Sequence, residues 1–145
     1  MRIPATLLLV LTLAIPGLAL AGGSSKIATL YKDPQCGCCQ AYADHLRESG
    51  FTVTVRPTHD LAQIKRQHGV PAGFEGCHTT LIDGYVVEGH VPMNSLDRLL
   101  VERPDIKGIS LPGMPPGSPG MTGHKAEPFT IYELSDGEPK VYAVE

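Results

Sequence analysis

Apolar and polar residues alternate in two short segments of the chain, residues 26–31 and residues 51–55. A period of two is typical of strands with one buried face. Between these segments, apolar positions recur at helical spacing from Cys38 or Cys39 up to Ser49-Gly50, where the glycine is typical of a helix end. The pattern therefore predicts a strand, a helix and a second strand, with cysteines at the start of the helix.

A second helix and a hairpin follow in the same pattern. Asp60 precedes the helix. The residues expected to face inward from this helix are Leu61, Ile64 and His68. Two strand-like runs, residues 79–82 and 85–88, are joined by Asp83-Gly84, and this dipeptide between two such runs is a strong signal for a hairpin turn.

A third helix is predicted before Pro104. Ser95 is the expected cap, and Leu96, Leu99 and Leu100 form its apolar stripe. The order of elements is then β-α-β-α-β-β-α, an α/β arrangement in two layers. This order resembles the thioredoxin fold.

Residues 105–145 differ in composition from the segments before them. Residues 111–121 are rich in proline, glycine and methionine and cannot continue a helix or a central strand. Residues 128–134 and 140–144 return to strand character. We expect a loop and a C-terminal hairpin that packs on the thioredoxin-like domain of residues 22–104, because an isolated hairpin is only marginally stable in water.

Residues 1–21 have the pattern of a secretory signal. Arg2 precedes an apolar stretch at residues 7–15, and the small residues Ala19 and Ala21 suit cleavage after Ala21. The apolar stretch is shorter than the roughly 20 residues that span a bilayer. An uncleaved anchor is the alternative. We expect an exported protein without a membrane anchor after cleavage.

The charge of the chain gives no indication of nucleic acid or anionic lipid as a partner. Loss of Arg2 with the leader changes the formal net charge from −3 to −4. The chain has no run of lysine or arginine that would attract a phosphate backbone or a lipid surface. We expect a monomer.

Three of the four cysteines lie within Cys36-Gly37-Cys38-Cys39. Thiolates at a helix N-terminus are stabilised by unpaired backbone N–H groups and the helix dipole. Cys36 and Cys39 have the C-x-x-C spacing of redox sites. Cys38 adds a thiol that dithiol exchange does not need, and soft sulfur ligands favour Cu(I). Export to an oxidising compartment also calls for a metal or a redox role, since thiols without one would form disulfides.

Further candidate ligands lie in three other segments. Cys77 is expected in a loop against the start of the first helix, with an inert buried thiol as the alternative. Met114 and Met121 flank a rigid loop and offer thioether sulfurs, with ordinary packing as the alternative. His90 is expected in a loop near the same site, with a surface or capping role as the alternative.

Three other interpretations stay open. Zinc is a less suitable metal, because structural zinc usually takes two paired knuckles and not one crowded knuckle with a single distant cysteine. A thiol–disulfide oxidoreductase would use Cys36 as nucleophile and Cys39 as resolving thiol. A small secreted domain with two stabilising disulfides is the structural interpretation.

Several motifs together resemble the periplasmic CopG-type copper-resistance proteins, a thioredoxin-like group marked by C-x-C-C. The matching segments are Tyr31–Cys39, Gly76–Thr79, Asp83–Pro92 and Pro112–Met121. The chain departs from true thioredoxins at Cys38 and at His78-Thr79, where those proteins carry a non-sulfur residue and a cis-proline. This departure counts against general disulfide exchange with protein substrates.

The resemblance implies copper binding in a Gram-negative periplasm with sulfur ligands from the C-x-C-C segment. We therefore expect copper ions and other periplasmic copper-handling proteins as partners. It also implies interconversion of Cu(I) and Cu(II) coupled to thiol redox. Together with the residue-based argument, it gives a candidate ligand set of Cys36, Cys38, Cys39, Cys77, Met114, Met121 and His90.

Overall fold

The computed structural model of the chain describes residues 26–135, 137 and 140–145. The predicted leader, residues 1–21, lies outside these residues. In chain order the elements are β1 (Ile27–Lys32), α1 (Gly37–Glu48), β2 (Thr52–Pro57), α2 (Leu61–Gln67), β3 (His78–Ile82), β4 (Tyr85–Glu88), α3 (Met93–Glu102), β5 (Gly108–Ser110), β6 (Thr130–Leu134) and β7 (Val141–Val144).

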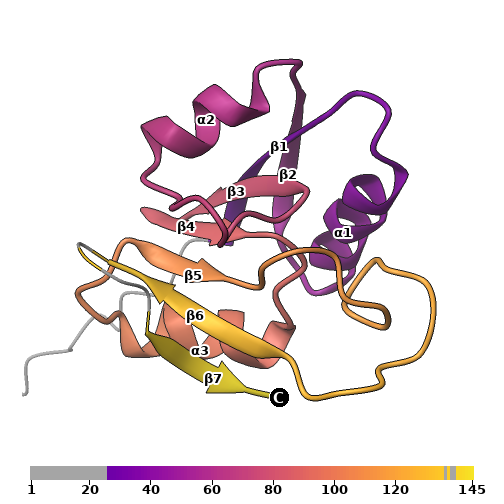
Figure 1. Cartoon of the computed structure of the whole chain (residues 1–145). Coiled ribbons are helices and arrows are strands. Elements are labelled where there is room, and N and C mark those ends of the chain that lie inside the picture. The colour runs from indigo at the N-terminus through magenta and orange to yellow at the C-terminus, as the bar shows by residue number, and fades with distance from the viewer. Residues whose placement is uncertain (1–25, 136, 138–139) are drawn as a thin grey trace, which may run out of the picture.

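The seven strands form one mixed sheet in the order β2-β1-β3-β4-β5-β6-β7 (Figure 1). The β1–β2 and β4–β5 pairs are parallel, and the other four pairs are antiparallel. The tight turn at Asp83-Gly84 joins β3 to β4, with both residues at positive φ. The predicted hairpin is therefore present.

The main core lies between the sheet and two of the helices. Tyr42 of α1 and Leu96 and Leu99 of α3 belong to one buried cluster with Leu30 and Ile82 of the sheet. A smaller cluster of Val70, Val86 and Leu134 packs with Leu81. Because adjacent strand residues point to opposite faces, Leu81 and Ile82 show that these clusters lie on opposite sides of the sheet.

The predicted order of elements is found, but the sheet is larger than predicted. The C-terminal strands β6 and β7 are not a separate hairpin resting on the domain. They extend the same sheet, because the three-residue strand β5 pairs with β4 on one side and β6 on the other. The sequence pattern does not predict β5, because a strand of three residues is too short to show a period of two.

One local prediction is wrong, and another is incomplete. Ser95 does not cap α3: the helix begins at Met93 after Pro92, and the buried Ser95 hydroxyl donates to the Glu145 carboxylate. In α2 the buried residue is Lys65, at 6% exposure, whereas Leu61, Ile64 and His68 are only half-buried. Both differences depend on partners that lie far away in sequence.

The loop that follows β5 runs to α1 before the chain returns to β6 (Figure 1). Gly120 lies against the backbone of α1, and a Cβ placed there would come within 2.6 Å of the Tyr42 amide nitrogen. With φ at +79°, this position favours glycine on both counts. The loop thus lies close to the start of the cysteine helix.

No helix in the described part of the chain has the length and hydropathy needed to cross a bilayer.

Candidate metal centre

Four cysteine sulfurs from two distant segments meet at the N-terminus of α1. Cys36 caps the helix, and its Sγ accepts a hydrogen bond from the Cys39 amide at 3.3 Å. Cys77 approaches from the segment before β3, with its Sγ 3.4 Å from that of Cys39 and 3.8 Å from that of Cys38. The Sγ atoms of Cys36 and Cys38 are 3.5 Å apart. We call these four residues the thiol cluster.

The thiol cluster has a paired half and a free half. Cys36 and Cys39 form a disulfide, whereas Cys38 and Cys77 are free thiols. Cys39 is fully buried, and Cys36 is partly exposed. The four sulfurs lie within 4.8 Å of one another, and groups so close can hold a metal ion once the disulfide is reduced.

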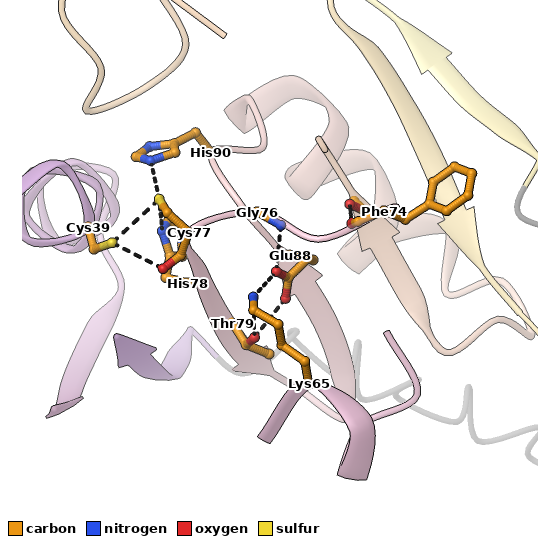
Figure 2. A network of polar contacts seen from close by, with 10 residues as sticks. Cys39, Lys65, Phe74, Gly76, Cys77, His78, Thr79, Glu88 and His90 are labelled. Carbon is orange, nitrogen blue, oxygen red and sulfur yellow. Dashed lines mark hydrogen bonds and ion pairs between the residues drawn. The ribbon is translucent and has the colours of Figure 1, made fainter. Parts of the chain in front are cut away.

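Two histidines extend the cluster on the side of Cys77. His90 Nε2 lies 2.9 Å from the Cys77 Sγ, and His78 Nδ1 lies 3.5 Å from it. Figure 2 shows Cys77 between Cys39 and His90, with His78 next to it. Cys77, His78 and His90 form a second group of metal-capable atoms within 4.8 Å.

The orientation of His90 is set by the loop of residues 111–121. Its Nδ1 lies 2.6 Å from the carbonyl oxygen of Pro119, which can only accept a hydrogen bond. Nδ1 therefore carries the proton, and in the neutral ring the Nε2 lone pair points at the Cys77 sulfur. A metal-binding histidine is commonly held in this way through its second nitrogen.

Burial shifts the pKa values of Cys77 and of the two histidines beside it. Burial, with a smaller contribution from the neighbouring Cys38, raises the pKa of Cys77 to about 12, so that Cys77 is a neutral thiol at neutral pH. Burial also lowers the pKa values of His78 and His90. Neutral imidazoles are the form that binds metals, and a bound metal would replace the thiol proton.

Comparison with known proteins points to one family. A family model described as "Protein of unknown function, DUF411" matches residues 74–121. Two solved structures of "Copper resistance protein copG", Form 2 and Form 1, are each 39% identical to the chain, with TM-scores of 0.76 and 0.75. The alignments cover 82% of this chain and 97% and 96% of those chains. No curated protein sequence matches significantly.

The chain belongs to the CopG family of copper resistance proteins. The predicted family is therefore confirmed, and the thiol cluster contains its C-x-C-C motif. The family model covers Cys77, His90 and both loop methionines but not the C-x-C-C segment. The thiol cluster of this CopG relative is thus assembled from the matched region and from a segment outside it.

The predicted ligands of the CopG site differ in how the structure places them. Cys36, Cys38, Cys39, Cys77 and His90 come together, and His90 is fully buried and not a surface residue. Met114 is 54% exposed, and Met121 is half-buried directly after Gly120, which lies on α1. Both methionines stay predicted ligands.

Sequence reasoning missed His78, Lys65 and Glu88. The alternation of β3 could have indicated His78. His78 and the core residue Ile82 are four positions apart in the strand, so their side chains point to the same face of the sheet. Lys65 and Glu88 form a buried ion pair next to Cys77. Burial raises the pKa of the Glu88 carboxyl, although the Lys65 ammonium opposes the shift.

Proposed function

We propose that this protein binds Cu(I) in the periplasm as part of copper resistance, through the thiolates of Cys36, Cys38, Cys39 and Cys77. The observation that carries the proposal is the meeting of four sulfurs within 4.8 Å in a chain of this family. Reduction of the Cys36–Cys39 disulfide frees all four as ligands. His90 and one or both of Met114 and Met121 complete the set.

The choice of copper over zinc rests on ligand softness and on the family. Tetrahedral zinc with Zn–S bonds of about 2.3 Å needs sulfurs about 3.8 Å apart, so the distances in the thiol cluster suit zinc as well. Cu(I) is favoured because thiolate and thioether ligands are soft and because the solved relatives are named copper resistance proteins. Direct competition between the two metals decides this point.

Oxidation of the thiols can be coupled to the copper. Two Cu(II) ions take one electron each from two thiols of the cluster, giving two Cu(I) ions, the Cys36–Cys39 disulfide and two released protons. The reverse reaction consumes the disulfide and two protons and yields two Cu(II) ions. The structure contains the disulfide beside two free thiols, and this pairing supports such an exchange.

The remaining parts of the proposal concern export and architecture. Residues 1–21 direct the chain to the periplasm and are removed. Residues 22–104 form a thioredoxin-like domain, and the order of elements from β1 to α3 supports this assignment. Strands β5, β6 and β7 extend the sheet of this domain, and the hydrogen bond from His90 to Pro119 links the loop between β5 and β6 to the site.

A second candidate function is thiol–disulfide exchange. The observation that favours it is the Cys36–Cys39 disulfide at a helix N-terminus, with Cys36 partly exposed and Cys39 buried. Cys36 would then be the nucleophile and Cys39 the resolving thiol. Turnover of a disulfide substrate by metal-free protein supports this function, and the absence of turnover removes it.

The experiment for the copper function is an anaerobic titration of the reduced protein, lacking residues 1–21, with Cu(I) against a chromophoric Cu(I) chelator. We expect tight, stoichiometric binding that zinc does not displace. A Cys38→Ser variant should lose affinity, because it removes one of the four sulfurs. Unchanged stoichiometry and affinity in Cys38→Ser would exclude that residue as a ligand, and absence of Cu(I) binding by the wild type would refute the function.

A further inference from the structure

A buried ion pair lies against the segment that leads into Cys77 (Figure 2). The Lys65 side chain is 7% exposed and the Glu88 side chain 0%, and the Lys65 ammonium contacts the Glu88 carboxylate. Removing two charges from water costs more than a well-packed apolar pair would, so such a pair is weak evidence for stability. Stability alone therefore does not explain why Lys65 and Glu88 are buried together.

The Glu88 carboxylate is the centre of these contacts. Its Oε1 accepts a hydrogen bond from the Gly76 amide at 2.7 Å, in addition to the Lys65 ammonium. Its Oε2 accepts one from the Thr79 hydroxyl at 2.7 Å, and Lys65 also donates to Thr79 Oγ1 at 3.3 Å. Figure 2 shows this network linking α2, β3, β4 and the segment that leads into Cys77.

The segment before Cys77 has little freedom to adjust. A Cβ on Gly76 would come within 2.4 Å of the Gly89 Cα, so the two backbones are in direct contact. The Ser110 hydroxyl donates to the carbonyl oxygen of Phe74 at 2.6 Å. Gly76, which is adjacent to Cys77, makes both the contact with Gly89 and the hydrogen bond to Glu88.

We propose that Glu88 is a positioning residue of the copper site: the bond that its side chain accepts from the Gly76 amide keeps the Cys77 sulfur within reach of the other three, while Lys65 offsets the buried charge of the carboxylate. This inference rests on the proposed copper function. Cys77 is the one sulfur of the thiol cluster from outside the C-x-C-C segment, so its place depends on tertiary contacts. Groups that support metal ligands typically change metal affinity by about 10- to 100-fold when altered.

The test compares two double variants that both remove the charges. In Lys65→Leu/Glu88→Gln, the amide oxygen at position 88 still accepts from Gly76, and the amide NH₂ donates to the Thr79 hydroxyl. In Lys65→Leu/Glu88→Leu, the side chain at position 88 has a similar size but no acceptor. Two properties are measured on each variant and on the wild type: Cu(I) affinity of the reduced protein, and hydrogen exchange at the Gly76 amide in metal-free protein.

We expect the Gln variant to keep near wild-type affinity and slow exchange at Gly76. The Leu variant should bind Cu(I) about 10- to 100-fold more weakly and exchange the Gly76 amide faster. Equal Cu(I) affinity in the two variants, or equal exchange at Gly76, overturns the proposal. If the Leu variant does not fold, Lys65→Leu/Glu88→Val replaces it, since valine suits the strand.

The two properties separate this proposal from the copper function on which it rests. If the wild type binds no Cu(I), the copper function fails. The exchange measurement in metal-free protein then still decides whether Glu88 holds the segment that carries Cys77.

Discussion

Replacing Cys77 with serine tests the central geometric result, the approach of one distant sulfur to the C-x-C-C segment. The Cys77 Sγ lies 3.4 Å from that of Cys39, 3.8 Å from that of Cys38 and 2.9 Å from His90 Nε2. Serine keeps the size and a polar atom at this point, but it offers hard oxygen in place of soft sulfur. We expect Cys77→Ser to fold and to bind Cu(I) more weakly.

The expected loss of Cu(I) affinity is estimated by dividing the free energy of metal binding equally among four ligands. Structural four-ligand zinc sites contribute roughly 10–16 kcal/mol at neutral pH, or about 2.5–4 kcal/mol for each ligand. Since about 1.4 kcal/mol corresponds to a factor of ten, one lost sulfur should weaken Cu(I) binding by roughly 10²- to 10³-fold. No other cysteine is present in the chain to replace it.

The assay is competition for Cu(I) against a chromophoric chelator under anaerobic, reducing conditions. Urea unfolding of metal-free Cys77→Ser serves as the control for folding. A variant that unfolds like the wild type and binds Cu(I) about 10²-fold or more weakly supports the four-sulfur site. Wild-type affinity in a folded variant would show that Cys77 is no ligand, despite its distance from the other sulfurs.

Further predictions concern the disulfide, the loop and the buried histidine. The protein isolated in air should show two reactive thiols under denaturing conditions and four after reduction, and only the reduced form should bind a full complement of Cu(I). Met114→Leu and Met121→Leu should each lower Cu(I) affinity by roughly tenfold, whereas Met93→Leu in α3, the matched control, should leave it unchanged; equal effects at all three positions would argue against thioether ligands. Gly120→Ala should cost about 1–3 kcal/mol of unfolding free energy, measured in urea, because the added methyl group meets the backbone of α1 at a positive φ. Burial lowers the pKa of His78 in the folded protein, so the His78 imidazole binds a proton more readily in the unfolded chain. The free energy of unfolding should therefore fall as the pH decreases through about 6.5. His78→Asn should flatten this part of the pH profile, and an unchanged profile would contradict the pKa shift.

Local patterns predicted most of the fold because their signals span few residues. The alternation at β1 and β2, the Asp83-Gly84 turn and the apolar stripe of α3 each depend on neighbours in sequence. The residues that local patterns placed wrongly depend on remote partners. The Ser95 hydroxyl donates a hydrogen bond to Glu145, and Lys65 faces inward because its ammonium forms an ion pair with the buried Glu88 carboxylate. No periodicity over a few residues contains that information.

The candidate site also has a part that local sequence predicts and a part that depends on remote contacts. Three cysteines are neighbours in sequence, and the strand and helix around them place them at a helix N-terminus. The approach of Cys77 to these three cysteines depends on the order of strands in the sheet, which places β3 beside β1. The buried state of His90 and its bond to Pro119 depend on a loop from the C-terminal part of the chain.

The amino-acid sequence alone determined the local elements, the soft character of the ligands and the kinship with CopG proteins, because each depends on residue type and short spacing. The tertiary structure alone decided which side chains meet around Cys77, since contacts between residues tens of positions apart depend on how strands pair and on what each buried polar group needs as a partner. It also decided that Lys65 and Glu88 lie against the segment that carries that sulfur. A buried charge requires an opposite charge nearby in space, and the linear order of residues does not show which one will be there.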